Sequence, residues 1–226
     1  MFGNSTFKLF SIDPITGRQP KQIPIDSPYG NPLIVNDFMS VSHGSSSSYG
    51  DGGLRGYTLS SNKLVWTSTT SNGQYPASVN NIIYSVSYAR SDQKNYLVAV
   101  DQATGVQKWK YIPSQGNIEN GSMSVFGNSV TIKVLNNVDK KHRIHVIDAG
   151  TGKLRWESAG LAYNNFTLAV GSKVYSSADG EITAFDINTG NILWKTTGIK
   201  QVSTSPMCMI TADGKTYYVP QSGMQQ

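Results

Sequence analysis

Cysteine is almost absent from this sequence, since Cys208 is the single one in 226 residues. One cysteine cannot form an intrachain disulfide or a zinc site built from cysteines. Its neighbours Met207, Met209 and Ile210 indicate a buried strand position. We interpret Cys208 as an inert thiol, because a nucleophilic cysteine needs a polar, electropositive site.

Long apolar runs are also missing, and no segment is long enough to span a bilayer. The first ten residues, MFGNSTFKLF, lack the basic region, apolar core and cleavage site of a signal peptide. Charged residues are only 15% of the chain, and Ser, Thr, Asn, Gly and Tyr are abundant. Three Asn-x-Ser/Thr sequons, at Asn4, Asn120 and Asn165, are compatible with glycosylation and export. We expect an extracellular or cell-envelope (periplasmic) protein whose leader lies outside this sequence; the alternative is a cytosolic one.

Concentrated charge is scarce as well. The formal net charge is +5, from 19 basic and 14 acidic residues that are scattered along the chain. The one basic cluster, Lys140 to Arg143, falls in a predicted loop between strands, and we interpret it as a solvated loop. A nucleic-acid binder concentrates such charge on one face. We therefore expect no nucleic-acid partner.

The sequence does contain one phrase five times, which predicts a repeat architecture. The copies are LFSIDPITGRQPK (9–21), RGYTLSSNKLVW (55–66), LVAVDQATGVQKW (97–109), HVIDAGTGKLRW (145–156) and EITAFDINTGNILW (181–194). In four copies an Asp precedes a Gly by four residues, and a Thr stands directly before that Gly. These residues are Asp13 and Gly17, Asp101 and Gly105, Asp148 and Gly152, and Asp186 and Gly190.

This spacing predicts a hairpin closed by a type I turn and a bulge. The Asp side chain accepts backbone N–H groups across the turn, and Gly takes the position of positive φ. In the copy at 55–66 Asn62 replaces Gly, and Asn is the next best residue for that conformation. Alternating apolar residues before each Asp, such as Val98 and Val100, predict a half-buried strand.

A second kind of hairpin precedes each of the last four copies and occurs once more after the fifth. Its two-residue turns suit types I′ and II′ and recur about every 40–45 residues, the period of a propeller blade. They are Asn36-Asp37, Asn80-Asn81, Gly127-Asn128, Gly171-Ser172 and Asp213-Gly214. The chain is therefore predicted to be all-β, a single β-propeller domain over residues 1–226 made of four-stranded antiparallel blades.

The predicted whole blades span residues 31–69, 75–112, 119–158 and 162–197. Residues 1–26 supply only the last two strands of a blade, and residues 201–220 only the first two. Joined, they make one shared blade, which closes a ring of five and removes exposed sheet edges. Two alternatives remain: the chain is a fragment of a ring of seven or eight blades, or the half-blades complete one another between chains.

Four tryptophans stand four residues after the turn Gly or Asn, namely Trp66, Trp109, Trp156 and Trp194. A residue so large at one repeated position predicts packing between blades, with the indole N–H on a backbone acceptor. The alternative is an aromatic cage for a ligand. A cage needs the tryptophan side chains to lie around one point, and equivalent positions on the outermost strands of different blades lie far apart. Lys21 replaces Trp in the shared blade, so we expect the loosest junction there.

The pattern of an alternating strand, Asp-x-x-Thr-Gly and Trp resembles the quinoprotein-like (PQQ-like) β-propeller repeat, also called the tryptophan-docking repeat. AVDQATGVQKW (99–109), VIDAGTGKLRW (146–156) and AFDINTGNILW (184–194) carry the resemblance, which covers nearly the whole chain. The motif specifies the fold and leaves the function open. The family includes quinone-dependent dehydrogenases and non-catalytic outer-membrane assembly scaffolds of the BamB type, and the chain is more similar to the latter.

Quinone-dependent catalysis needs residues that this sequence does not supply. The resemblance to the dehydrogenases implies a calcium site of Glu, Asn and Asp, an Asp base, a tryptophan floor and, in alcohol dehydrogenases, a vicinal cysteine pair. One cysteine excludes the pair, and the four tryptophans and four turn aspartates already have structural roles. We expect no catalytic residues, no cofactor and no metal site.

The remaining histidines give weaker signals. His142 and His145 are three residues apart, which on a strand places them on opposite faces, and we expect both at the surface. His43 precedes GSSSSYGDGG (44–53), the one low-complexity segment. The segment is typical of a flexible connection; as a mobile binding loop, its contacts would be His43, Tyr49 and Asp51.

The predicted function is a non-catalytic propeller that binds a protein partner or assembles with itself, through loops on one ring face. The aromatic residues near strand ends that we would test first are Tyr29, Tyr49, Tyr75, Tyr111 and Tyr163. A carbohydrate-binding propeller, with a glycan partner, is the alternative. A quinone-dependent dehydrogenase is the third.

Overall fold

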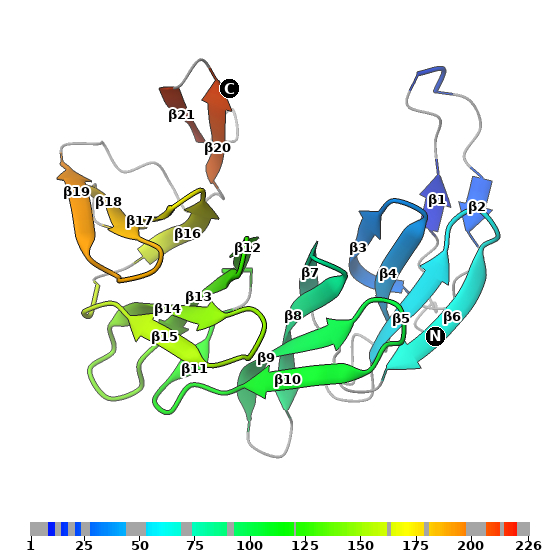
Figure 1. Ribbon diagram of the computed structural model, residues 1–226, viewed down its shortest axis with the longest axis horizontal. Helices are drawn as coiled ribbons and strands as arrows, with labels where there is room; N and C mark the ends of the chain where they lie inside the picture. The colour runs from blue at the N-terminus through cyan, green and yellow to red at the C-terminus, as the bar shows by residue number, and fades with distance from the viewer. Residues whose placement is uncertain are drawn as a thin grey trace, which may run out of the picture. The chain divides into compact units, whose positions relative to one another are not determined.

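The computed structural model describes residues 9–11, 15–17, 21–23, 28–43, 53–68, 74–89, 93–119, 121–161, 164–178, 181–197, 207–212 and 215–220. Every regular element in these ranges is a β-strand, and neighbouring strands pair antiparallel (Figure 1). This confirms the all-β prediction. The described part of the chain holds no helix of the length and apolarity that a membrane span requires.

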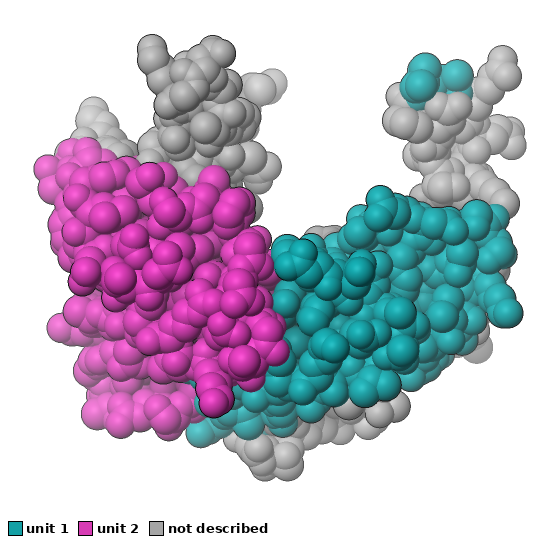
Figure 2. Space-filling model, in the orientation of Figure 1, with its two compact units in different colours: residues 1–112 teal, residues 113–226 magenta. Residues whose placement is uncertain are grey.

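The chain divides into two compact units, residues 1–112 and 113–226 (Figure 2). Unit 1 contains two four-stranded sheets whose strands are hydrogen-bonded in chain order. The first consists of β3 (Pro28–Val35), β4 (Phe38–His43), β5 (Gly53–Thr58) and β6 (Lys63–Ser68). The second consists of β7 (Gln74–Val79), β8 (Ile82–Ala89), β9 (Lys94–Asp101) and β10 (Gln107–Tyr111). A separate hairpin pairs β1 (Leu9–Ser11) with β2 (Lys21–Ile23).

Unit 2 repeats this pattern. One sheet contains β13 (Ser129–Leu135), β14 (His142–Asp148) and β15 (Leu154–Glu157), and its inner strand is split into β11 (Asn117–Ile118) and β12 (Ser124–Phe126). The next contains β16 (Asn164–Val170), β17 (Lys173–Ala178), β18 (Glu181–Asp186) and β19 (Ile192–Thr196). A second hairpin pairs β20 (Met207–Ala212) with β21 (Lys215–Pro220).

The predicted two-residue turns join the first and second strands of all four large sheets. Their leading residues have positive φ, for example 53° at Asn36, 53° at Asn80 and 59° at Gly171. Such turns match the twist of the antiparallel strands that they connect. The prediction is confirmed for these four turns, and Asp213-Gly214 lies outside the described residues.

The strands before the turn aspartates are more deeply buried than their alternation predicted. In β9 the four consecutive residues Leu97 to Val100 are each 0% exposed, so both faces of the strand are covered. The prediction of a half-buried strand is wrong for β9. Covered residues on both faces of one strand are typical of the blades of a propeller.

Sheets within each unit pack face to face. In unit 1, Leu54 and Trp66 of the first sheet form one core with Ile83, Val98 and Val100 of the second. In unit 2, Ile144 and Val146 of one sheet form a core with Ala169, Val174 and Phe185 of the next. Successive four-stranded sheets stacked in this way are propeller blades. The β-propeller prediction is therefore confirmed at the level of the blade.

The hairpins β1–β2 and β20–β21 are each two-stranded. They correspond to the two half-blades that the sequence predicts at residues 1–26 and 201–220. No strand pairing between them is present among the described residues. The shared blade, the blade boundaries and the count of five remain predictions.

Candidate functional site

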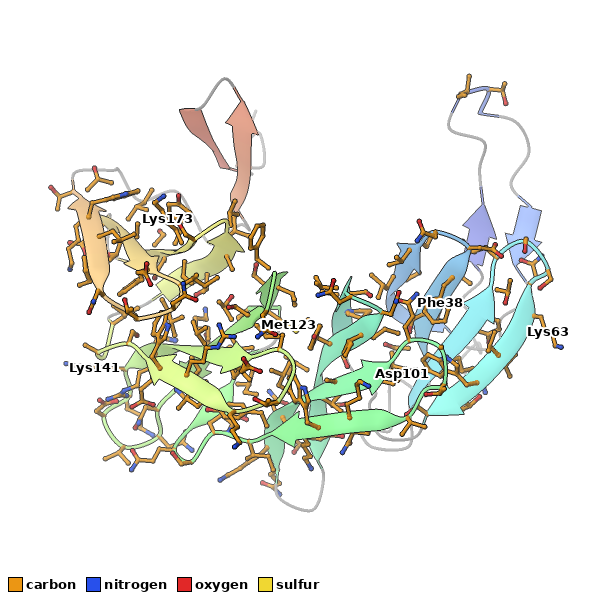
Figure 3. The ribbon with its side chains drawn as sticks, viewed as in Figure 1. Phe38, Lys63, Asp101, Met123, Lys141 and Lys173 are labelled. Atoms are coloured by element: carbon orange, nitrogen blue, oxygen red, sulfur yellow. The ribbon has the colours of Figure 1, made fainter. Side chains whose placement is uncertain are left out.

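The turn aspartates act as hydrogen-bond acceptors for their own turns. Asp101, labelled in Figure 3 at the end of β9, accepts from the backbone N–H of Ala103 and Thr104 and from the Thr104 hydroxyl, at 2.9–3.1 Å. Asp148 and Asp186 each make the same three contacts within their turns. Hydrogen bonds from Thr104 lower the pKa of Asp101, and those from Thr189 and Asn188 lower the pKa of Asp186. The carboxylates therefore shape the turns.

Asp148 has an additional partner. Its second oxygen accepts from Arg155 at 2.6 Å and from the Asn128 side chain at 2.9 Å. The hydrogen bond from Arg155 is the largest cause that lowers the pKa of Asp148 to about 2. Arg155 also donates to the carbonyl of Asn128 at 2.7 Å, so it connects the two turns at this end of the sheet.

Two tryptophans bridge adjacent sheets within a unit. The Trp66 Nε1 donates to the carbonyl oxygen of Gln102 at 2.8 Å, and the Trp156 Nε1 donates to that of Ile187 at 2.9 Å. Each acceptor is the residue directly after the turn Asp of the next sheet. The indole therefore docks on the Asp-x-x-Thr-Gly turn of the neighbouring blade.

Each docked indole lies directly against the turn glycine. A Cβ added to Gly105 would lie 2.6 Å from Cδ2 of Trp66, and one added to Gly190 would lie 2.8 Å from Cδ2 of Trp156. Side-chain carbons do not approach this closely. Positive φ alone does not demand glycine here, because Asn62 adopts φ 53° at the equivalent position. Glycine is needed at these two positions because the neighbouring tryptophan lies too close for a side chain.

A β-bulge stands directly before each tryptophan. The register of the outer strand shifts just before Trp66, Trp109, Trp156 and Trp194, which leaves the preceding residue as the extra one. A bulge redirects the side chains beside it. The residues opposite the tryptophans are Gly56, Ala99, Val146 and Ala184. At Gly56 a Cβ would collide with the Trp66 ring, which explains a residue without a side chain there.

The other two tryptophans differ in exposure. Trp109 is half-buried, and its ring lies 5.8 Å from that of Tyr84. The ring of Trp194 lies 5.9 Å from that of Tyr175. Trp194 is 38% exposed, whereas Trp66 is 8% exposed.

The two remaining turn glycines have the same backbone conformation as Gly105 and Gly190. Gly152 has φ 72° and Gly17 has φ 63°.

Several predicted site residues lie outside the described part of the chain. They are Asn4, Asp13, Tyr49, Asp51, Asn120 and Tyr163. Tyr29, Tyr75 and Asn165 belong to β3, β7 and β16, with side chains outside the description. Each of the three lies at an irregularity in the register between the first and second strands of its sheet. Tyr111 is the last residue of β10 and is half-buried.

His43 is the member of the predicted binding loop that the structure describes. It ends β4, and its Nε2 is buried without a hydrogen bond. Burial, and then the nearby positive charge of Arg55, lower the pKa of His43. His43 is therefore an uncharged, partly buried residue at neutral pH.

The prediction that His142 and His145 are surface residues is wrong. They are 7% and 3% exposed. They do lie on opposite faces of β14, but both faces of this strand are covered. The basic cluster is also divided, because Lys140 and Lys141 are exposed in a loop whereas His142 begins a strand.

The two histidines contact different acids. His142 Nδ1 lies 3.3 Å from Glu119 Oε2, which also contacts Lys133 Nζ at 2.7 Å. His145 Nε2 lies 3.4 Å from Glu157 Oε2. Burial, and then the positive charge of Arg143, lower the pKa of His145 to about 4. Sequence reasoning missed the cluster of Glu119, Lys133 and His142, because it assembles from two strands and the residue that follows a third. Among the described residues, no group of three or more His, Cys, Asp or Glu has the geometry of a metal site.

The loop between β13 and β14, residues 136–141, contains several internal hydrogen bonds and has an exposed tip. The Asn136 side chain accepts from the backbone N–H of Val138 at 2.8 Å and donates to Gln115 at 3.1 Å. Arg143 makes two hydrogen bonds to Asp139, at 3.1 and 2.6 Å, and the hydrogen bonding lowers the pKa of Asp139 to about 2. The Val138 side chain at the tip is 78% exposed.

Comparison with known proteins identifies relatives of this arrangement. The family model described as outer membrane protein assembly factor BamB matches residues 36–158 and again residues 120–225. The second match starts about two blades after the first, as a repeat permits. A search of curated proteins by sequence found no match.

Three similar solved structures share the fold. BamB from Moraxella catarrhalis has 18% identity and a TM-score of 0.58, over 96% of this chain and 68% of that one. The quinohemoprotein alcohol dehydrogenase ADHIIG from Pseudomonas putida HK5 has 13% identity and a TM-score of 0.59, over 86% and 39%. Sqt1 from Saccharomyces cerevisiae has 11% identity and a TM-score of 0.62, over 92% and 61%. At such low identity these likenesses show the fold alone, and the chain spans well under the full length of each.

Proposed function

The chain belongs to the family of the outer membrane protein assembly factor BamB, and on that premise we propose that it is a non-catalytic β-propeller that binds other proteins. It acts as an interaction or assembly module, in the cell envelope or outside the cell. The family description, which names an assembly factor, supports a protein partner. The low charge content supports the compartment.

The observation that carries the proposal is the ordered loop at residues 136–141. A rigid loop can present an apolar side chain to a partner without the entropic cost of ordering a flexible one. Asn136 and Asp139 hold the backbone around Val138 by hydrogen bonds. Lys140 and Lys141 beside it are exposed, and the exposed Asp139 is paired with Arg143, so the tip is apolar with a rim of net positive charge. This composition fits a protein surface that is apolar at the centre and acidic around it.

The structural use of the motif residues also supports a non-catalytic role. Asp101, Asp148 and Asp186 are each engaged by three hydrogen bonds within their own turns. Trp66 and Trp156 are engaged in packing between blades. The residues that make this family recognisable thus have architectural functions in this chain.

Site-specific photo-crosslinking tests the proposal. A photoreactive amino acid replaces Val138 in the purified chain, which is exposed to an extract of envelope proteins, and crosslinked proteins are identified by mass spectrometry. Each candidate is then purified, and its binary affinity is measured by calorimetry. Val138→Asp should weaken binding roughly tenfold or more, because it places a charge in an apolar contact.

A matched control is Val106→Asp. Val106 is 63% exposed and follows Gly105 in the turn between β9 and β10, so it is a similar surface valine in another loop. This variant should bind like the wild type. Equal affinity of wild type and Val138→Asp would remove the loop from the proposal. Specific binding to glycans with no protein partner would favour the carbohydrate-binding alternative instead.

A further inference from the structure

Gly160 lies between β15 and β16, and its backbone does not require glycine, because it is not among the glycines with positive φ. A Cβ added to Gly160 would nevertheless lie 2.7 Å from Cδ and 3.1 Å from Cβ of Lys141. Side-chain carbons do not approach this closely. The aliphatic part of the Lys141 side chain therefore packs directly on the Gly160 backbone, and this contact explains the residue without a side chain.

Hydrogen bonds of the backbone hold both partners of this contact. The Lys141 N–H donates to Asp139 Oδ1 at 3.0 Å, and the Lys141 carbonyl accepts from the Asn136 N–H at 2.9 Å. Leu161, the residue after the glycine, exchanges two backbone hydrogen bonds with His142, the residue after the lysine, at 3.1 and 2.8 Å. The glycine and the lysine therefore lie side by side at the start of β14.

The charged end of Lys141 is available to a ligand. Lys141, labelled in Figure 3, is exposed, and it forms no ion pair with any residue that the structure describes. The acid of the same loop, Asp139, is bound by Arg143 through both carboxylate oxygens, at 3.1 and 2.6 Å. A lysine whose stem is already packed loses less side-chain freedom on binding an anionic group than an unpacked one.

We propose that Lys141 binds a carboxylate of the protein that the loop at residues 136–141 recognises. Val138 at the tip supplies the apolar contact, and Lys141 selects an acidic residue beside it. The inference rests on the proposed function, because it identifies the residue of the loop that recognises the partner's charge. The formal net charge of +5 acts in the same direction, since it attracts acidic partners at long range.

Lys140 provides a comparison within the same loop. It carries the same charge one position earlier and is also exposed. Long-range attraction depends on both lysines to a similar extent and is weakened by salt. Packing of the stem matters only in direct contact with the partner. Replacing Lys141 should therefore weaken binding more than replacing Lys140, and the difference should depend on Gly160.

The test uses the purified chain and a synthetic peptide with a central leucine between three glutamates on each side. NMR titration of the isotope-labelled protein at about 0.15 M salt measures the dissociation constant, including values in the millimolar range. Lys141→Ala should weaken binding about fivefold, the upper end for an exposed ion pair. Gly160→Ala should weaken it about threefold, because the added Cβ displaces the lysine stem without changing any charge. Lys140→Ala should have an effect of less than about twofold.

Two controls separate recognition from a general disturbance of the loop. Gly150→Ala adds a Cβ to another glycine of unit 2 without positive φ, where the nearest atom would be 3.5 Å away, and this variant should bind like the wild type. In the Lys141→Ala background, Gly160→Ala should have no further effect, because the stem that it displaces is gone. Circular dichroism checks that each variant is folded.

Equal effects of Lys140→Ala and Lys141→Ala would overturn the proposal. So would a peptide that does not bind, or one that binds equally well with glutamine in place of every glutamate. An effect of Gly160→Ala that persists without Lys141 would show that the glycine acts on the fold alone, which also contradicts the proposal. A partner crosslinked at Val138 that binds Lys141→Ala as tightly as the wild type would refute this inference and leave the proposed function intact.

Discussion

Gly190 and Gly171 form a matched pair for measuring how tightly a tryptophan docks. Both are in unit 2 and have positive φ, 75° and 59°. They differ in surroundings, because a Cβ at Gly190 would lie 2.8 Å from Trp156 and one at Gly171 would meet nothing. Replacing either by alanine imposes about 1–2 kcal/mol for the left-handed conformation. At Gly190 the collision adds about 1–3 kcal/mol, the usual range for overpacking.

The collision can be isolated with a double-mutant cycle. Trp156→Ala alone should reduce the free energy of unfolding by about 3–5 kcal/mol, as for other large aromatic truncations. In that background Gly190→Ala should cost only the backbone strain, about 1–2 kcal/mol, because the indole is gone. The coupling energy between the two positions is then about 1–3 kcal/mol.

Urea unfolding followed by circular dichroism gives the required free energies, provided that the slope with denaturant is unchanged. Gly171→Ala in both backgrounds is the control, and its effect should not depend on Trp156. Equal costs of Gly190→Ala with and without the tryptophan would show that docking does not determine the glycine. A cost of Trp156→Ala below about 1 kcal/mol would refute the docking contact itself.

The remaining predictions concern ionisable groups. Burial lowers the pKa of His145 to about 4 in the folded state, below its unfolded value. The unfolded state therefore binds the proton first as pH falls from about 6.5 to 4, and up to about 3 kcal/mol of stability should be lost over this range. His145→Gln should flatten that part of a plot of unfolding free energy against pH, and an unchanged slope would contradict the assignment. Asp148 also has a lowered pKa, about 2, so its contribution is present above about pH 4 and should be lost as pH falls toward 2. Asp148→Asn should destabilise the protein more than Asp186→Asn at pH 7, because only Asp148 pairs with Arg155, and high salt should reduce the difference; equal effects would mean that the ion pair contributes nothing measurable.

The blade was predictable because its determinants are local. The Asp-x-x-Thr-Gly spacing and the two-residue turns specify their own backbone conformations through short-range hydrogen bonds and allowed φ values. The positive φ of Asn62 was likewise predictable from the residue type alone. Contacts within one turn depend on residues only a few positions apart, which the sequence displays directly.

The burial of His142 and His145 was not predictable in this way. Their opposite faces follow from the period of a strand, but whether both faces are covered depends on sheets far away in the sequence. For β9 the signal was in the sequence, because Leu97 to Val100 are four consecutive apolar residues, the pattern of a strand that is covered on both faces. The cluster of Glu119, Lys133 and His142, by contrast, requires two strands and the residue that follows a third to be in register.

The sequence by itself determined the repeat, the turns, the strand pattern and the identity of the residues that dock. It did so because each of these is encoded at fixed short spacings. Only the tertiary structure decided what the turn glycine is for, since the indole that occupies its space belongs to another blade.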